Sequence, residues 1–285
     1  MSAPGRGRDR VRAAAAGVAL VAVLWIVGAL SVLVTGVVAA QRAELRMAGA
    51  ARALLVGEAA GQAAIQLVLQ RMTAGGAPTG RLTRTTVPYD GRDIVVETMP
   101  LTGLLDLNQA PQPLLAAFLA GVGGADERRA AEIAAAVVAR RESAGAAPNA
   151  PSHFAAPEEL LSVPGVDYDL FARIADFVTV GSGGGARINP LAAAADMLSF
   201  LAAGNAALAQ GIARERDAGA PLIDTTRLEG SFIDATVSSR YRFTAVVPMP
   251  DGARVLVQRD VDTAAAVDAV TPWQTLRSAT RRVGG

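Results

Sequence analysis

The stretch AAAAGVALVAVLWIVGALSVLVTGVVAA, residues 13–40, contains no charged side chain. A helix of about 20 apolar residues crosses the hydrocarbon core of a bilayer, so this run is long enough for one transmembrane span. Four arginines and one aspartate precede it within residues 1–12. Positively charged flanks stay on the cytoplasmic side of a membrane. The sequence therefore predicts a single-pass protein with a cytoplasmic N-terminus and most of its chain across the membrane.

A cleaved signal peptide is the alternative for this segment, because Ala39 and Ala40 before Gln41 have the form of a small-residue cleavage site. The apolar core of a signal peptide is only about 7 to 15 residues long. Residues 41–72 contain no proline and are rich in helix-forming residues, so the helix is expected to continue beyond the membrane. We therefore favour a membrane anchor over a signal peptide.

The later part of this helix has an apolar face. Ile65, Val68, Leu69 and Met72 follow one another at spacings of three and four residues, which place side chains on one side of a helix. We expect one helix from about residue 13 to about residue 73, with that face buried against a folded domain. The weak helix breakers in the stretch are Gly49, Gly57 and Gly61.

Strand signals flank a helical block. Residues 82–87 and 93–98 are strand-like and surround the tetrapeptide YDGR, in which Asp-Gly predicts a tight hairpin. Residues 241–247 and 254–261, joined by PMPDG, predict a second hairpin. From about residue 104 to about residue 216 the pattern is helical. We predict an α+β fold: a long N-terminal helix packed on an antiparallel β-sheet, with a large all-α insertion between strands.

The insertion contains a degenerate internal repeat. Its first unit opens with LDLNQAP, turns at Gly-Val-Gly, residues 121–123, and ends near Glu142. Its second unit contains PEELLSVPGV, residues 157–166, and ends near Phe177, while RINP at residues 187–190 echoes the opening of the first unit. Each unit is a helix, a glycine turn and a helix, and so resembles the helix-hairpin-helix or SAM-like module.

The N-terminus resembles that of type IV pilins and type II secretion pseudopilins. Gly17 follows a short basic leader and precedes the apolar run VALVAVLW. In that family a prepilin peptidase cuts after the glycine, so the resemblance implies cleavage between Gly17 and Val18 and a methylated mature N-terminus. Most members have a glutamate at the fifth mature position, where this chain has Ala22. That departure, together with a large helical insertion, is typical of the minor pseudopilin K (GspK) subfamily.

The resemblance covers about residues 10 to 265 and implies a non-enzymatic subunit of the inner membrane with a periplasmic C-terminal domain. Such a subunit would cap or initiate the pseudopilus that drives protein export across the outer membrane. The partners it implies are the I- and J-type minor pseudopilins, the major pseudopilin, the prepilin peptidase, the inner-membrane assembly platform and the lipid bilayer.

Six segments are expected along the chain. They are a basic leader (1–17), the transmembrane part of the helix (18–40), the rest of the helix with the first hairpin (41–103), the helical insertion (104–218), the returning strands (219–265) and a loose C-terminal tail (266–285).

A membrane-anchored DNA receptor is the alternative function. The backbone N–H groups of a glycine turn at a helix N-terminus can bind phosphate, and the turn at residues 121–123 has that form, with two arginines at 128–129. However, residues 126–127 are acidic, and the second turn, PGVD at 164–167, also carries an acid where phosphate would approach. The formal net charge is only +1, so we do not expect nucleic acid as a partner.

An enzyme is the third possibility, and the composition argues against it. The chain has no cysteine and a single histidine, His153, without a recognisable Ser or Asp partner, so we assign no catalytic residue and no cofactor site. Residues 182–185, Ser-Gly-Gly-Gly, lack the lysine of a phosphate-binding loop and predict a flexible linker.

Metal binding is restricted to hard oxygen ligands. Structural calcium is possible by family resemblance, but no D-x-D-x-D-G loop is present, so no metal site is assigned. Residues 140–142 and 214–217 are charged and predict solvated helix faces. The carboxylates considered for calcium are Asp106, Glu158, Glu159, Asp167, Asp169 and Asp176.

Overall fold

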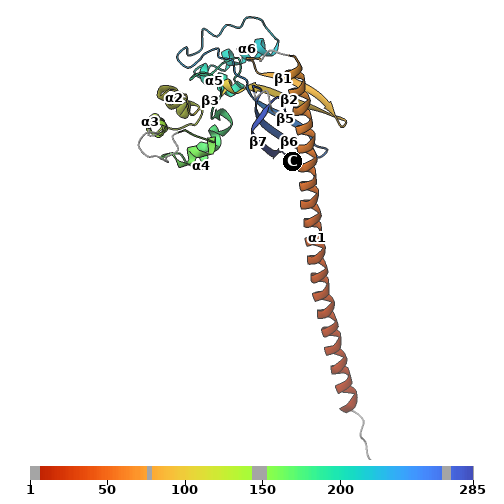
Figure 1. The fold of residues 1–285 in the computed structure, drawn as a ribbon. Helices are drawn as coiled ribbons and strands as arrows, with labels where there is room; N and C mark the ends of the chain where they lie inside the picture. The colour runs from red at the N-terminus through yellow and green to blue at the C-terminus, as the bar shows by residue number, and fades with distance from the viewer. Residues whose placement is uncertain (1–6, 76–78, 143–152, 265–270, 285) are drawn as a thin grey trace, which may run out of the picture. The chain divides into compact units, whose positions relative to one another are not determined.

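The computed structural model describes residues 7–75, 79–142, 153–264 and 271–284. The chain forms two compact units, Met1–Val56 and Gly57–Gly285. Helix α1, Gly7–Gly75, belongs to both, and its backbone is helical throughout, as the sequence predicts for the segment after the leader. It is the only described element of the first unit (Figure 1).

The second unit is built on a five-stranded antiparallel sheet with the order β1-β2-β5-β6-β7. Its strands are β1 (Thr83–Tyr89), β2 (Arg92–Pro100), β5 (Arg240–Pro248), β6 (Arg254–Asp262) and β7 (Gln274–Val283). The two predicted hairpins are β1-β2 and β5-β6. In the first, Asp90 and Gly91 have φ values of 49° and 70°, the left-handed pair that an Asp-Gly hairpin turn requires.

The C-terminal segment differs from the sequence-based expectation of a loose tail. Residues Gln274–Val283 form β7, paired antiparallel with β6. The strand is mostly exposed and consists mainly of arginines and small or polar residues, so it lacks the apolar run by which strands are recognised. Pairing with an already formed edge at β6 stabilises it instead.

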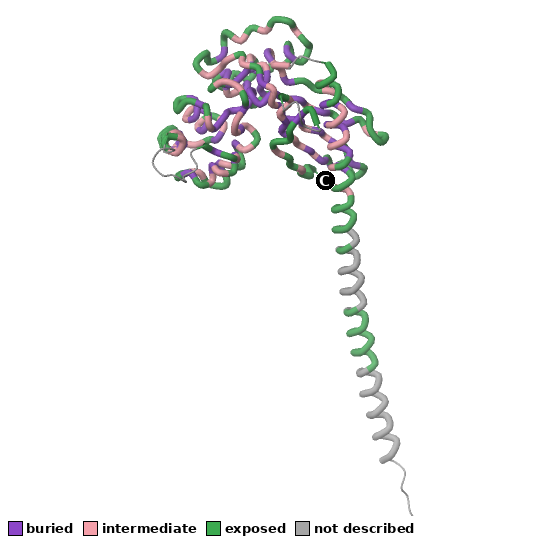
Figure 2. The backbone as a smooth tube through the Cα atoms, in the orientation of Figure 1, coloured by how far each residue is buried: buried purple, intermediate pink, exposed green. Residues whose placement is uncertain are grey.

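Helix α1 packs on one face of the sheet through small residues. A Cβ at Gly57 would lie 2.7 Å from Cγ2 of Val255, and one at Gly61 would lie 2.5 Å from Cγ2 of Val257. These two glycines are therefore points of close approach between helix and sheet, and not merely weak helix breakers. The predicted apolar face is buried as well: Ile65, Val68 and Leu69 are buried, and Met72 is half-buried. Figure 2 shows buried and half-buried residues on the part of α1 beside the sheet.

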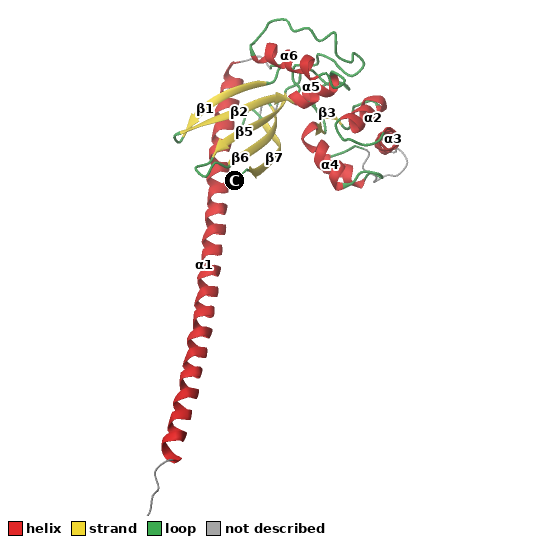
Figure 3. Ribbon diagram, turned by 180° about the vertical axis from the view of Figure 1, so that it is seen from behind, coloured by secondary structure: helices red, strands yellow, loops and turns green. Residues whose placement is uncertain are grey.

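The helical block lies between β2 and β5 and gathers beside the sheet (Figure 3). Most of its buried apolar side chains form one cluster that includes Leu114, Phe118, Ile133, Leu170 and Leu198. The block contains η1 (Leu101–Gly103), β3 (Leu105–Asp106), α2 (Gln112–Gly121), α3 (Glu127–Glu142), η3 (Pro157–Ser162), α4 (Tyr168–Ile174), η4 (Ala175–Phe177), β4 (Val178–Thr179), α5 (Ala195–Leu201) and α6 (Ala206–Asp217). The predicted α+β class, with a helical insertion between strands of one antiparallel sheet, is confirmed.

Candidate functional site

The predicted processing site, Gly17 and Val18, lies within the helical backbone of α1. The structure does not describe the side chains of this part of the helix, so the cleavage stays a prediction. Further along α1, seven large apolar side chains are more than half exposed: Val23, Leu24, Trp25, Ile26, Val27, Leu30 and Leu33. A continuous exposed apolar surface of this kind marks a contact with lipid or with another protein.

The described side chains also include a segment that is long and apolar enough to cross a membrane, Met47–Gly75, but 39% of its most apolar window is buried inside the protein. The burial comes from the contact with the sheet. This later segment is thus in part a core helix, whereas most of the predicted span at residues 18–40 lies outside the described side chains.

In the first glycine turn, between α2 and α3, the backbone N–H groups donate hydrogen bonds to carbonyl groups of α2. Val122 and Gly123 donate to the carbonyl of Phe118, Gly124 donates to Ala120, and Ala125 donates to Leu119. A phosphate-binding turn needs N–H groups that point outward unpaired. This turn has no free N–H between Val122 and Ala125.

Aspartates occupy the helix starts after both turns. Asp126 Oδ1 accepts from the N–H of Arg129 at the beginning of α3, and Asp167 Oδ1 accepts from the N–H of Leu170 at the beginning of α4. The Leu170 N–H and the Arg129 side chain hold the pKa of Asp167 below its ordinary range, so this carboxylate is charged at neutral pH. An incoming phosphate would meet a negative charge at either turn.

The two turns are also cross-linked by a reciprocal pair of arginines. Arg129, from the first hairpin unit of the insertion, donates to the carbonyl of Gly165 in the second turn and forms an ion pair with Asp167 at 2.6 Å. Arg173, from the second hairpin unit of the insertion, donates to the carbonyl of Gly123 in the first turn at 2.6 Å. Each hairpin unit thus bonds to the turn of the other hairpin unit, and both turns take part in packing inside the insertion.

Glycine is required at these turns for packing as well as for conformation. A Cβ at Gly123 would lie 2.7 Å from Cδ1 of Leu170, and Gly165 has a φ of 89°. The sequence identified the turns, but it did not identify Arg173 as a partner of the first turn. No pattern within either unit reveals a contact that depends on how the two units pack.

The Ser-Gly-Gly-Gly segment, predicted as a flexible linker, is a packed joint. Ser182 is buried, its N–H donates to Oδ2 of Asp106, and its carbonyl accepts from Ser238. A Cβ at Gly184 would clash with Thr102, and one at Gly185 would clash with Asp234. The prediction was wrong because glycine here permits close approach of neighbouring segments and not motion.

Two asparagines in the repeated openings have matching roles. Asn108 exchanges hydrogen bonds with the backbone of Phe154 in both directions. Asn189 is buried, and its side-chain amide donates to the carbonyls of Gly80 and Thr236 at 3.1 Å each. In both openings the amide therefore ties down a distant segment of the chain, which supports the repeat inferred from RINP and LDLNQAP.

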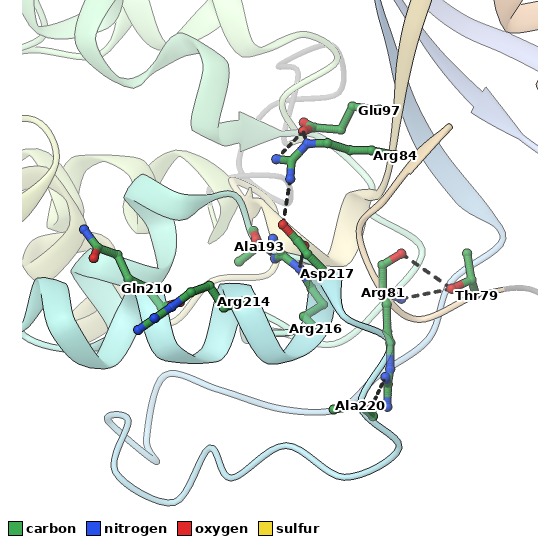
Figure 4. A network of polar contacts seen from close by, with 10 residues as sticks. All are labelled: Thr79, Arg81, Arg84, Glu97, Ala193, Gln210, Arg214, Arg216, Asp217 and Ala220. Carbon is green, nitrogen blue, oxygen red and sulfur yellow. Dashed lines mark hydrogen bonds and ion pairs between the residues drawn. The ribbon is translucent and has the colours of Figure 1, made fainter. Parts of the chain in front are cut away.

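A polar network joins α6 to the first hairpin of the sheet (Figure 4). Arg84 on β1 contacts Glu97 on β2 and donates to Asp217 at the end of α6 at 2.8 Å. Arg216 is 4% exposed, donates to the carbonyl of Ala193 and pairs with Asp217. The predicted solvated face at residues 214–217 is thus wrong for Arg216, because α6 packs where the helical block meets the sheet.

The charged face at residues 140–142 is also engaged. Arg140 pairs with Glu159 and lies 4.2 Å from the ring centroid of Phe154. Arg141 donates to the carbonyl of Ala110, and burial lowers its pKa despite the nearby acids. These arginines hold η3 and the chain before α2 against α3, so the prediction of a solvated face fails for Arg140 and Arg141, whereas Glu142 is exposed.

The carboxylates considered for calcium are dispersed. Among the described residues no group of three or more His, Asp or Glu side chains is placed to hold a metal ion. Four of them pair with arginines instead, namely Glu158, Glu159, Asp167 and Asp176. Calcium binding stays a prediction without an assigned site.

A groove of about 890 Å³ lies in the helical block, beside the first turn. Phe200 and Phe232 stack there with centroids 6.0 Å apart, and Arg173 and Ser199 also line it. His153, the one histidine, is exposed in another segment and does not line the groove. Ser199 therefore has no imidazole base beside it.

Comparisons with known proteins gave one kind of match. No protein-family model and no curated protein sequence matches the chain. Among solved structures the chain is similar to a chain of the GspK-GspI-GspJ complex from the enterotoxigenic Escherichia coli type 2 secretion system. The TM-score is 0.43 and the sequence identity 14%, over 85% of this chain and 99% of that chain.

Proposed function

We propose that this protein is a minor pseudopilin of a type II secretion system, of the K type. The observation that carries the proposal is the single helix α1, which bears exposed apolar residues at Val23–Leu33 and is buried by a sheet at Gly57–Leu69. A helix with an exposed apolar segment followed by a segment packed on a sheet suits a subunit that is first held in lipid and then packed among the helices of a filament.

The arrangement of the second unit supports a terminal position in that filament. The helical block is inserted between β2 and β5, the paired turns join its two hairpin units, and the Asn189 contacts and the Arg84 network hold it in place. A fixed block of this size would obstruct a further subunit beyond it. The proposed role is therefore to cap or initiate the pseudopilus, with I- and J-type minor pseudopilins and the major pseudopilin as neighbours.

The absence of an acid at Ala22 agrees with this position, since a subunit at the tip has no neighbour above it whose terminal amine needs an ionic partner. The proposed location is the inner membrane, with the N-terminus in the cytoplasm and the second unit in the periplasm. The proposed function is structural and involves no catalysis.

The geometry argues against the DNA-receptor alternative. Both glycine turns carry a charged aspartate at the helix start, and the first has no free N–H to offer a phosphate. Of the two arginines beside the first turn, Arg129 is engaged with Gly165 and Asp167, whereas Arg128 is 88% exposed and lies 3.8 Å from Glu132.

Processing by a prepilin peptidase tests the proposal. The membrane-expressed full-length chain is analysed by intact mass and N-terminal sequencing, with and without a cognate peptidase. The expected product begins at Val18 and carries a methyl group. Gly17→Val should abolish cleavage, whereas Gly28→Ala, at an unobstructed glycine of the same helix, should leave it unchanged.

An uncut chain would overturn the pseudopilin assignment and leave a plain membrane anchor. Cleavage near Ala40 would indicate a secreted domain and would also overturn it. If Val18 is the mature end, co-purification with I- and J-type minor pseudopilins tests the K-type position, and a chain that purifies only with the major pseudopilin would contradict that position.

A further inference from the structure

Strand β7 forms an open edge of the sheet. It pairs with β6 on one side, and no other strand lies beside it in the described sheet. Among described residues, the backbone hydrogen bonds outside helices and strands include none from Gln274–Val283. In an antiparallel ladder alternate residues direct their N–H and C=O groups away from the partner strand. Half of the backbone groups of β7 are therefore available to another chain.

The edge is regular enough to template a new strand. From Arg277 to Val283 the pairing with β6 runs without a break, and the single register shift, at Asp260/Val261, lies before this stretch. Eight of the ten residues of β7 are exposed, and the strand contains no proline. Two large apolar side chains stand exposed on it, Leu276 at 43% and Val283 at 40%.

The opposite edge of the sheet, strand β1, is protected against the addition of another strand, unlike β7. Strand β1 contains Pro88, which has no N–H to donate. Proline on an edge strand is a common means of preventing strand addition. The sheet therefore has one blocked edge and one open edge.

Charge restricts what can pair with β7. The strand carries Arg277, Arg281 and Arg282, and residues 271–284 include no acid. Each arginine pairs within the chain with Glu158, Asp176 or Asp251, and all of these acids are about half exposed. Exposed ion pairs contribute little free energy, so they can be exchanged for a carboxylate on an incoming strand. A second copy of β7 would instead bring arginines together.

We propose that β7 is a docking edge for an extended segment of a partner protein, which adds as a sixth strand. The segment carries carboxylates where it faces the β7 arginines and aliphatic residues where it faces Leu276 and Val283. Main-chain hydrogen bonds supply the attraction, and the arginines select the acidic partner. The inference does not depend on the assignment as a pseudopilin.

A peptide probe tests it with the full-length chain in detergent micelles. The probe has about ten residues, with glutamates placed to face the β7 arginines and valine or threonine at the other positions, and is blocked at both ends. Backbone amide hydrogen exchange is followed by mass spectrometry. The expected result is slower exchange of Arg277–Val283 when the peptide is added, with exchange of β1 unchanged.

Two altered peptides separate strand addition from simple charge attraction. A central proline should abolish the protection, because it removes a main-chain donor. Lysine in place of glutamate should weaken binding by about tenfold, since facing charges then repel. Equal protection by the proline peptide, or no protection by the glutamate peptide, would overturn the proposal.

Charge reversal on the protein provides the complementary test. The Arg277→Glu/Arg281→Glu double variant should reverse the preference, favouring the lysine peptide by about tenfold. Arg128→Glu, at an 88% exposed arginine of α3, is the matched control and should behave as the wild type. If the double variant is unfolded by circular dichroism, the neutral Arg277→Gln/Arg281→Gln pair replaces it and should remove the preference. Protection of β7 without peptide that rises with protein concentration would indicate self-pairing and contradict the proposal.

Discussion

Arg242 and Asp260 form the most deeply buried ion pair of the described residues, with side chains only 4% and 7% exposed. Two parallel hydrogen bonds of 2.8 and 2.9 Å join them across β5 and β6, and Arg242 also donates to the carbonyl of Asp176 at 3.0 Å. The third bond reaches the helical block, so one arginine neutralises a buried carboxylate and links the block to the sheet.

Removing one member of this pair should be costly. Arg242→Met leaves the Asp260 carboxylate buried without a counter-ion, and we expect the free energy of unfolding to fall by about 3–5 kcal/mol. The double variant Arg242→Met/Asp260→Leu should recover most of that loss, because no charge then remains buried. Urea unfolding followed by circular dichroism measures both, and a loss below about 1 kcal/mol in the single variant would contradict the burial argument.

Asp262 makes the stability depend on acid pH. Burial alone raises the pKa of Asp262, but hydrogen bonds from Arg240, the Ala264 N–H and Ser239 outweigh it, and the net pKa in the folded protein is lowered. A lowered folded pKa contributes stability that is complete above the unfolded value, about 3.9, and is lost as the pH falls through the folded value.

We therefore expect the wild-type stability to decline below about pH 4 more steeply than that of Asp262→Asn, which has no carboxyl group to titrate at this position. Thermal unfolding between about pH 2 and pH 7 measures the difference, with Asp251→Asn as an exposed control. Parallel pH profiles for wild type and Asp262→Asn would show that these hydrogen bonds do not lower the pKa.

Among the elements, α1 best shows how spacing on a helix becomes packing. Its apolar positions, Ile65, Val68 and Leu69, are recognisable from their periodicity. The glycines one and two turns earlier are not apolar side chains at all, yet they allow the helix to approach Val255 and Val257. A hydrophobic pattern therefore finds only part of this interface.

Gly61→Ala should lower the free energy of unfolding by about 1–3 kcal/mol, because the new methyl group meets the branched side chain of Val257. Gly49→Ala is the matched control on the same helix, where a Cβ has no neighbour within 4 Å. That change should be neutral or stabilising by up to about 1 kcal/mol, since alanine favours helix. Equal effects of the two substitutions in urea unfolding would rule out close packing at Gly61.

The molecule as a whole divides within α1, at Val56/Gly57. The sheet and the helical block contain the buried core, and the residues of α1 that contribute to that core begin at Gly57 and Ala60. The preceding part of the helix therefore adds no described buried side chain to the second unit.

A chain that starts at Gln41 should unfold at the same temperature as the full-length protein, because the core remains intact. A chain that starts at Thr79 should lose cooperative unfolding and bind a hydrophobic dye, because the sheet face that α1 covers becomes exposed. Calorimetry and dye fluorescence distinguish the two. A stable second unit without any of α1 would contradict the assigned role of Gly57–Leu69 in the core.

Local patterns were enough for much of the architecture. The apolar run at residues 13–40, the Asp-Gly turn at residues 90–91 and the glycine turns of the insertion each depend on neighbours in the chain, so they predicted the long helix, the first hairpin and the repeated helical units. The placement of the insertion between strands followed from the order of these signals. Periodicity and turn chemistry act over a few residues and can be seen without tertiary structure.

Contacts between distant segments were decided only in the folded molecule. Residues Gln274–Val283 form strand β7 because they pair with the edge strand β6. Ser182–Gly185 is closely packed because Thr102 and Asp234 lie against its glycines. Arg173 donates to the carbonyl of Gly123, which belongs to the other hairpin unit. Arg216 is buried for the same reason, since α6 lies where the block meets the sheet. Such contacts depend on which surfaces meet after folding, and no short-range spacing in the chain encodes them.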